Sequence, residues 1–232
     1  ATSGSFDVIT SDQVYVHCPP RGWQTLTRTP HKVQDPAVCG VSGSFLLVGG
    51  WDGEQFTRQC YCYNHQQATW QRCADMPTAR SAAAAVVVAG EQVLVLGGWA
   101  GRPLATVEAY SMSSNTWSSR RSMKQGMGAP ITAVINNIMC VLFDDESTNK
   151  PSQRGDEISL QLYNTQTDRW RYGAPLPGGM GGTWGARAVA VNNTMIVAGG
   201  AGGICAQYML DTDTWIKLTS PNVNHGYSSL VL

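Results

Sequence analysis

Short apolar runs separated by polar turns recur along the chain, and one unit shows the pattern clearly. Residues 81–89 are small and β-branched, and a second apolar run over residues 92–96 ends at Gly97-Gly98. Residues 106–110 alternate like a third strand, and Trp117 opens a fourth after a polar turn. Apolar runs of this length, bounded by Gly, Asn and Ser, are typical of β-strands. The unit is therefore predicted to be an antiparallel meander of four strands.

The same order of strands is predicted in neighbouring units. One has strands at 38–41, 45–48, 59–63 and 70–73, and another at 186–191, 194–198, 205–208 and 215–218. The unit around 134–143 departs from the pattern, because Phe143-Asp144 stands where the glycine pair belongs. An enlarged polar stretch, 145–156, follows it. We expect an exposed loop there, either solvated or used to bind a partner.

Aromatic residues mark the period of the repeat. Five tryptophans are spaced by 47, 47, 53 and 45 residues: Trp23, Trp70, Trp117, Trp170 and Trp215. The last four each follow a tyrosine by seven positions: Tyr63, Tyr110, Tyr163 and Tyr208. A period of about 40–50 residues made of short strands is typical of a β-propeller. We expect these rings to pack between adjacent blades, and the glycine pairs to allow positive φ or a close backbone approach.

The two ends of the chain predict how the ring closes. Residues 6–11 resemble a second strand, followed by strands at 13–17 and 23–26, so this unit lacks a first strand. Residues 226–232 resemble a first strand with nothing after it. Together they predict one composite blade and a single five-bladed domain over residues 1–232. The alternative is a truncated six-bladed ring.

Composition limits the classes of partner. Lys plus Arg equals Asp plus Glu at 16 each, so the overall charge favours neither nucleic acid nor an anionic membrane surface. The apolar run at 82–89 is far shorter than the roughly 20 residues that span a bilayer. Seven cysteines without framework spacing predict reduced thiols, and hence the cytoplasm or nucleus.

Catalytic and metal-binding patterns find little support. The four histidines show no metal-ligand spacing, and Cys60 and Cys62 share a strand face without a second cysteine pair. The glycine-rich segment 178–182 lacks the lysine of a phosphate-binding loop. The sequence therefore predicts no catalytic residues, no metal and no cofactor.

A glycine pair, then tyrosine, then tryptophan after a polar turn resembles the Kelch repeat, over nearly the whole chain. The segments 49–53 and 76–81 are especially similar to it. The resemblance implies a Kelch β-propeller, and a partner-binding mouth formed after the glycine pairs and at first-strand starts. The residues at those positions, with the adjacent loop, are Trp51, Asp52, Phe56, Arg80, Ser81, Trp99, Arg102, Asp145, Trp184, His225 and Tyr227. Arg80 could bind a carboxylate of the partner, and Trp51 and Trp99 either face the partner or pack under loops.

The resemblance also implies a class of function. Kelch propellers of the BTB-Kelch and F-box-Kelch types are protein-interaction modules, which predicts substrate recognition for a cullin-RING ubiquitin ligase through domains absent from this chain. An actin-associated scaffold is the first alternative. A Kelch-fold enzyme resembling galactose oxidase or a sialic acid mutarotase is the second, and the copper ligands of the former cannot be placed here. The sequence does not identify the partner, a BTB, BACK or F-box region, or the oligomeric state.

Overall fold

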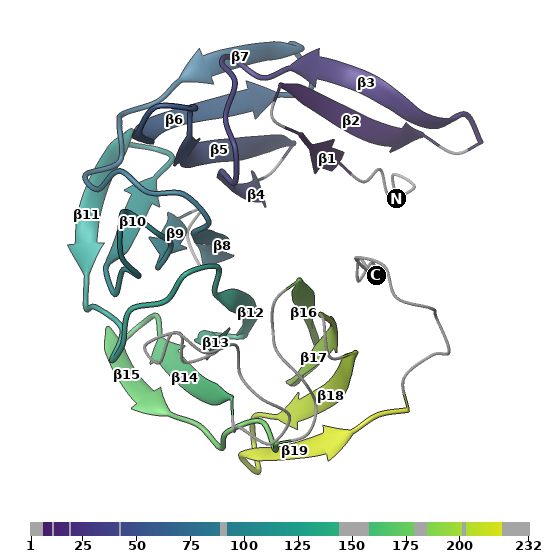
Figure 1. The fold of residues 1–232 in the computed structure, drawn as a ribbon, viewed down its shortest axis with the longest axis vertical. Coiled ribbons are helices and arrows are strands. Elements are labelled where there is room, and N and C mark those ends of the chain that lie inside the picture. Colours follow the sequence, from purple (N-terminus) through teal and green to yellow (C-terminus); the bar gives the residue numbers. More distant parts are fainter. Residues whose placement is uncertain are drawn as a thin grey trace.

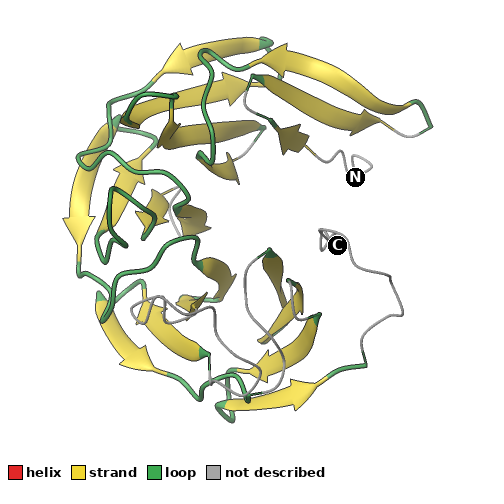
Figure 2. Ribbon diagram, in the orientation of Figure 1, coloured by secondary structure: helices red, strands yellow, loops and turns green. Residues whose placement is uncertain are grey.

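Five antiparallel sheets follow one another around a common centre in the computed structural model (Figure 1). The structure describes residues 7–10, 12–18, 20–41, 43–88, 92–143, 158–178, 185–200 and 203–219. Strands joined by turns and loops make up the ribbon of these residues, as Figure 2 shows. Four sheets have four strands, and the sheet nearest the N-terminus has three. The arrangement is that of a β-propeller in which each sheet is one blade.

The strands run in sequence order from the centre of the ring outward (Figure 1). The first sheet contains β1 (Asp7–Ile9), β2 (Gln13–Cys18) and β3 (Gly22–Arg28). The second contains β4 (Ala37–Val41), β5 (Ser44–Trp51), β6 (Phe56–Asn64) and β7 (Thr69–Arg72). The third contains β8 (Ala84–Val88), β9 (Gln92–Leu96), β10 (Val107–Ser111) and β11 (Thr116–Arg120). The fourth contains β12 (Ile131–Ile135), β13 (Ile138–Phe143), β14 (Ser159–Asn164) and β15 (Arg169–Tyr172), and the fifth β16 (Ala186–Val191), β17 (Thr194–Gly199), β18 (Ile204–Met209) and β19 (Thr214–Lys217).

The predicted four-stranded meander is confirmed in four sheets. Among the described residues the first sheet has three strands, and β1 is the innermost of them. The segment expected to supply the missing strand, 226–232, lies outside the described residues, so closure at five blades stays a prediction. The enlarged loop at 145–156 also lies outside them.

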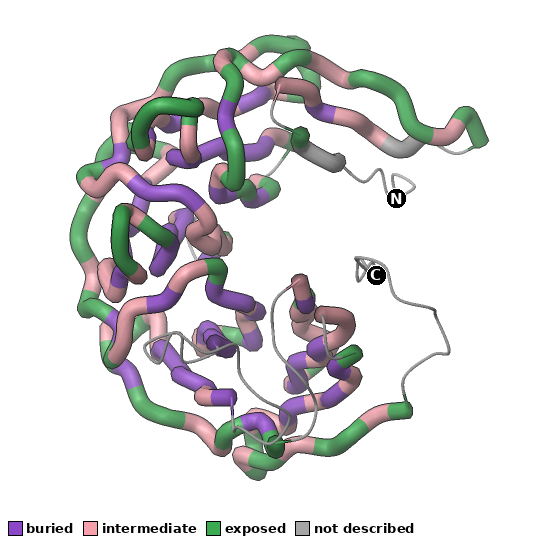
Figure 3. Tube along the Cα trace, viewed as in Figure 1, coloured by how far each residue is buried: buried purple, intermediate pink, exposed green. Residues whose placement is uncertain are grey.

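The apolar core is divided among the interfaces between neighbouring sheets, and buried residues concentrate in the inner and middle strands (Figure 3). One cluster joins β4–β7 to β8–β11, through residues such as Leu46 and Val95. A second joins β8–β11 to β12–β15, and a third joins β12–β15 to β16–β19. Each sheet is thus stabilised mainly by its neighbours, since burial of apolar area between them is the dominant favourable contribution.

The glycine pairs lie where the connection into the next sheet passes close to a strand end. A Cβ at Gly49 would lie 2.5 Å from the Arg80 carbonyl oxygen, and the Gly50 amide donates to that same oxygen at 2.7 Å. Gly97 and Gly98 repeat this contact with Met127, at 2.9 and 2.7 Å. Gly49 and Gly97 also have φ of 65° and 64°, a region that glycine adopts readily. Both parts of the prediction for these pairs are confirmed.

Four of the periodic tryptophans form hydrogen bonds between sheets. Each indole N–H donates to a backbone carbonyl of the preceding sheet or its exit: Trp70 to Arg28 at 2.8 Å, Trp117 to Ala74 at 2.7 Å, Trp170 to Arg121 at 2.7 Å and Trp215 to Ala174 at 2.8 Å. Each ring also stacks beside its tyrosine partner, with centroids 4.7 to 5.2 Å apart. The predicted packing between blades is confirmed for these four residues.

An Asn or Asp five residues after the tyrosine completes the contact in three sheets. Its side-chain oxygen accepts from the tyrosine hydroxyl and from a backbone N–H of the preceding sheet's exit: Asn115 with Tyr110 and Ala74, Asp168 with Tyr163 and Arg121, and Asp213 with Tyr208 and Ala174. The tryptophan binds the carbonyl of that same backbone residue. We call this Tyr, Asn/Asp and Trp set the interblade clamp. The clamp binds both the backbone N–H and the backbone carbonyl of one residue at the exit of the preceding blade.

The first and second sheets depart from this arrangement. Trp23 is 55% exposed on β3, so the prediction that it packs between blades is wrong. In the second sheet the position five residues after Tyr63 is Ala68, which has φ of 52° but no side-chain oxygen. Here the rings of His65 and Phe45 pack on Tyr63 instead.

We expect the two carboxylate clamps to make stability depend on acid. Burial acts to raise the pKa of Asp168 and Asp213, but the tyrosine hydroxyl, the backbone amide and neighbouring arginines outweigh it and lower the pKa of both. A carboxyl whose pKa is lowered by folding stabilises the fold above its ordinary pKa of about 4, and this contribution is lost as pH falls through the lower folded value. The double variant Asp168→Asn, Asp213→Asn keeps the acceptor oxygens, as Asn115 does naturally.

The variant should therefore lose less stability than the wild-type chain between about pH 5 and pH 3. Urea unfolding at a series of pH values measures this directly. Parallel stability curves for the two proteins would show that the clamp carboxylates do not contribute to acid unfolding.

Candidate functional site

Two adjacent sheets hold a tryptophan in the same way at the predicted mouth. Trp51 ends β5 and exchanges two backbone hydrogen bonds of 2.8 Å with Gln34, just before β4. Trp99 follows the second glycine pair and exchanges equivalent bonds with Ser81 at 3.0 and 2.8 Å. Because β4 and β8 are neighbours in space, the two loops lie at the same end of adjacent blades. The structure therefore places the two segments on neighbouring blades, and their part in binding a partner stays a prediction.

The loop after Trp51 is acidic and is held by hydrogen bonds to Asp52. The Asp52 carboxylate accepts the backbone N–H groups of Glu54 and Gln55, both at 2.9 Å. The hydrogen bonds from Gln55 and Glu54 lower the pKa of Asp52, so its charge is retained at neutral pH. Phe56 contacts the Trp51 ring edge-on, with centroids 4.8 Å apart. Trp51 is half-buried in this contact, while Asp52 and Glu54 are exposed.

The loop after Trp99 exposes an aromatic and a basic side chain. Trp99 is 39% exposed, and Arg102 is also exposed. The loop is held by backbone bonds from Ala100 to Arg102 at 3.1 Å and from Leu104 to Gly98 at 2.9 Å. Of the two tryptophans, Trp99 is thus the one whose ring is presented to solvent.

Arg80 does not lie on the binding surface, and its predicted role is wrong. Its side chain is fully buried and forms a 2.8 Å ion pair with Glu108. The guanidinium also donates to the carbonyls of Gly97 and Thr106, at 2.9 and 3.2 Å. Burial lowers the pKa of Arg80, although the Glu108 carboxylate opposes this effect. The guanidinium is therefore occupied by groups of the protein itself, and it joins β4–β7 to β8–β11 instead of binding a partner's carboxylate.

The remaining predicted residues divide into two groups. Ser81 is buried, and it contributes through its backbone bonds to Trp99. Asp145, Trp184, His225 and Tyr227 lie outside the described residues, so their place at the mouth stays a prediction.

An open cavity of about 550 Å³ adds residues that sequence reasoning missed. It is lined by Thr10, Val33, Gln34, Asp35, Pro36, Val38 and Arg187. Asp35 and Arg187 place opposite charges in its wall, and Val38 exposes 38% of its surface there. The sequence feature that could have pointed to Arg187 is a charged residue within the otherwise apolar strand β16. Gln34 lines the cavity and also pairs with Trp51 through its backbone, so the cavity adjoins the Trp51 segment.

The described residues also bear on metal binding and on membrane insertion. No group of three or more His, Cys, Asp or Glu gathers among the described residues as metal ligands would. Nor do these ranges include a helix with the length and apolar character needed to cross a bilayer. The six cysteines described with their side chains, Cys39, Cys60, Cys62, Cys73, Cys140 and Cys205, are free thiols.

The successive sheets define a β-propeller built from repeats. Comparison with known proteins identifies the type of repeat. The model of the Kelch motif matches residues 34–77 and 80–124, which contain the β4–β7 and β8–β11 sheets. The chain therefore contains Kelch repeats in these two sheets. The repeats and the relatives described next support a protein-interaction module.

The relatives are Kelch proteins with further domains. An F-box/kelch-repeat protein of Arabidopsis thaliana is 30% identical over 61% of this chain and 36% of its own length. Human Kelch repeat and BTB domain-containing protein 12 is 27% identical over 66% of this chain and 27% of its own length. Mouse Kelch-like protein 38 is 28% identical over 67% and 26%. The chain therefore spans only about a quarter to a third of these relatives, and none of the three is named as an enzyme.

Proposed function

We propose that the chain binds a segment of a partner protein at the mouth formed by the Trp51 and Trp99 loops and the adjoining cavity. The observation that carries this proposal is that two adjacent blades hold a tryptophan in the same way, each by two backbone bonds, and that Trp99 is exposed. Rigid aromatic residues beside charged ones are typical of binding hot spots. Preorganised loops also bind with little loss of conformational entropy.

The charges at this mouth favour a partner segment of mixed charge. Asp52 and Glu54 are exposed on one loop, and Arg102 is exposed on the next. Asp35 and Arg187 repeat the two signs in the cavity wall. A segment with one acidic and one basic side chain beside an apolar one could pair with both signs and cover Trp99. Charge complementarity of this kind governs specificity and association rate more than affinity.

The full-length protein is further proposed to act as a substrate-recognition subunit of a cullin-RING ubiquitin ligase. This proposal is supported by the F-box and BTB names of the relatives. The propeller would bind the substrate, and the domains that contact the ligase would lie outside this chain. The cytoplasm or nucleus is the proposed location.

Capture from a cell lysate with matched variants tests the binding surface. The mouth variant Trp99→Ala, Arg102→Ala removes two exposed groups without touching the ion pair at Arg80. Tyr172→Ala is the control, because Tyr172 is 55% exposed on the outer strand β15. We expect a specific partner to bind the wild-type chain and the Tyr172 variant, and to bind the mouth variant at least about tenfold more weakly, a loss of about 1.4 kcal/mol.

Equal capture by all three proteins would contradict the proposed surface. Ubiquitination of the captured partner by the full-length protein then tests the ligase role. Co-sedimentation with filamentous actin that is unaffected by the mouth variant would instead support a cytoskeletal scaffold.

A further inference from the structure

Four of the seven cysteines lie in the second blade and its exit. Cys39 is on β4, Cys60 and Cys62 are on β6, and Cys73 directly follows β7. Cys60 is completely buried at the interface with β8–β11, whereas Cys73 packs against the same cluster and is only partly buried. Cys62 and Cys73 are therefore partly accessible to a small reagent, whereas Cys39 and Cys60 are buried.

Cys60 and Cys73 are opposite each other across two antiparallel strands. The β6–β7 register pairs Cys62 with Gln71 and Tyr61 with Arg72, so the next pair along is Cys60 with Cys73. The Cys73 N–H donates to the Cys60 carbonyl at 2.9 Å, which is one of the two bonds of a hydrogen-bonded pair. Such pairs hold their Cα atoms about 5.5 Å apart. That separation lies within the range of about 4.4–6.8 Å over which disulfides form.

The environment of the two thiols differs in the way that a reactive pair requires. A hydrogen bond from the Cys60 thiol is the main cause that lowers the pKa of Cys73 well below its usual range. The same bond, together with burial, raises the pKa of Cys60. Cys73, which is also the less buried of the two, is therefore the residue that we expect to react first, since the thiolate is the reactive form of cysteine. Cys140, buried in another blade, has its pKa raised to about 12 and serves as a contrast.

We propose that Cys60 and Cys73 form a thiol pair that hydrogen peroxide oxidises to a disulfide. The Cys73 thiolate attacks one peroxide oxygen, the O–O bond breaks, and the other oxygen leaves as water after taking a proton. This gives a sulfenic acid at Cys73. The Cys60 sulfur then attacks the Cys73 sulfur, the S–O bond breaks, and the hydroxyl leaves as a second water with the Cys60 proton. Two thiols are oxidised, and one hydrogen peroxide is reduced.

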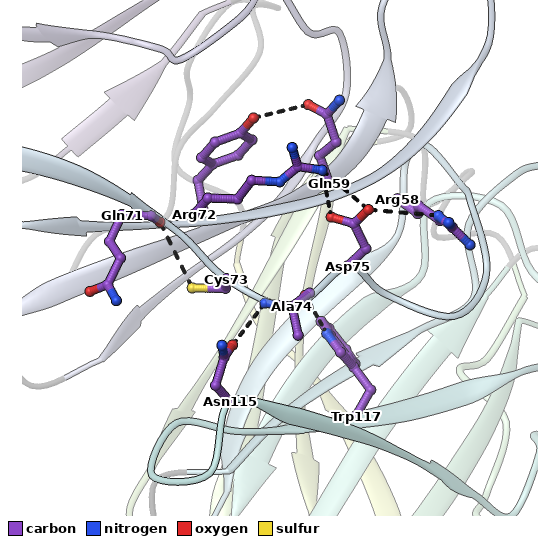
Figure 4. Close-up of polar contacts among 10 residues, drawn as sticks. Arg58, Gln59, Gln71, Arg72, Cys73, Ala74, Asp75, Asn115 and Trp117 are labelled. Atoms are coloured by element: carbon purple, nitrogen blue, oxygen red, sulfur yellow. Dashed lines mark hydrogen bonds and ion pairs between the residues drawn. The ribbon is translucent and has the colours of Figure 1, made fainter.

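Oxidation at this position acts beside an interblade clamp. Ala74, the next residue after Cys73, donates its N–H to Asn115 and accepts from the Trp117 indole, both at 2.7 Å (Figure 4). Asp75 is in turn paired with Arg72 at 3.1 Å (Figure 4). A disulfide would link the segment that leaves the second blade, at Cys73, to β6, at Cys60. It would do so beside the contact between the second and third blades. The oxidised form should therefore be the more stable one.

Mass spectrometry of the purified full chain tests the proposal. The reduced protein is treated with hydrogen peroxide, its remaining thiols are alkylated, and the disulfide is located by peptide mapping. Cys62→Ser is the decisive variant, because Cys62 is two residues from Cys60 and would otherwise confuse the assignment. We expect this variant to lose two hydrogen atoms and two alkylation sites, at Cys60 and Cys73.

Three further measurements separate the pair from general oxidation. Cys140→Ser should form the disulfide as the wild-type chain does, while Cys60→Ser and Cys73→Ser should not. Alkylation of Cys73 should have a midpoint below the ordinary thiol pKa of about 8.5. The oxidised chain should melt at least about 5 °C higher than the reduced chain, since the crosslink closes a short loop. A Cys62→Ser protein that gains oxygen at Cys73 without a crosslink, or does not react, would overturn the proposal.

Discussion

Replacing Arg80 with methionine should lower the free energy of unfolding by about 3–5 kcal/mol, which is a large part of the stability of an ordinary domain. The reason is that the substitution leaves the Glu108 carboxylate without its ion-pair partner. Glu108 is 4% exposed, and apart from Arg80 it is bound by the Thr78 hydroxyl at 2.6 Å. Without the guanidinium its charge would be buried with no counterion. Urea unfolding of the variant measures the loss.

A double variant distinguishes the buried charge from the loss of packing. Arg80→Met with Glu108→Leu removes both charges and should recover most of the stability, since buried ion pairs are often replaced by apolar residues at little cost. The carbonyls of Gly97 and Thr106 would still lose their donor, at about 1 kcal/mol each. If the double variant is no more stable than the single one, the uncompensated charge is not the cause.

The next blade already contains a neutral version of this contact. Met127 stands 47 residues after Arg80, and its carbonyl binds Gly98 as the Arg80 carbonyl binds Gly50. Gln161 occupies the place of Glu108, two residues before the blade's tyrosine, and its amide oxygen accepts from the Lys124 N–H at 2.8 Å. The charged pair Arg80 and Glu108 of one blade is therefore replaced by the neutral pair Met127 and Gln161 in the next. This supports the expectation that the double variant folds.

The sequence predicted a strand's bounds well where neighbouring residues in the chain determine them, and less well where another blade does. The strand at 92–96 was predicted with the bounds it has, because a glycine pair ends it. The strand predicted at 81–89 is shorter, since β8 begins only at Ala84. Before it, Ser81 and Ala82 bind Trp99 and Asp35, and Ala82 has φ of 48°. Alanine gives no sequence signal for that conformation, because the neighbouring blade imposes it.

The site was predicted less completely than the fold for the same reason. Trp51 and Trp99 were found because their position after a glycine pair is a local feature. Arg80 was assigned to the surface because the sequence does not show which carboxylate it meets. Glu108, a charge inside an otherwise apolar strand, was the available signal. Contacts between blades join residues about 30 to 50 positions apart, and only the folded ring brings them together.

The tryptophan clamp leads to the second large effect, at Trp170. Its side chain is 8% exposed and belongs to the cluster joining β8–β11 to β12–β15. Trp170→Ala should cost about 3–5 kcal/mol, because it leaves a cavity between two sheets and releases the Arg121 carbonyl. Thermal or urea unfolding measures this cost.

Two controls divide the loss at Trp170 into its parts. Trp170→Phe keeps an aromatic ring beside Tyr163 but removes the indole N–H, so its cost should be clearly smaller than that of alanine. Trp23→Ala removes the same ring from an exposed position and should cost less than about 1 kcal/mol. Equal costs at Trp23 and Trp170 would mean that the periodic tryptophans do not stabilise the ring through contacts between blades. A phenylalanine variant as unstable as alanine would assign the effect to the hydrogen bond, and thus to the hold on Arg121 rather than to packing.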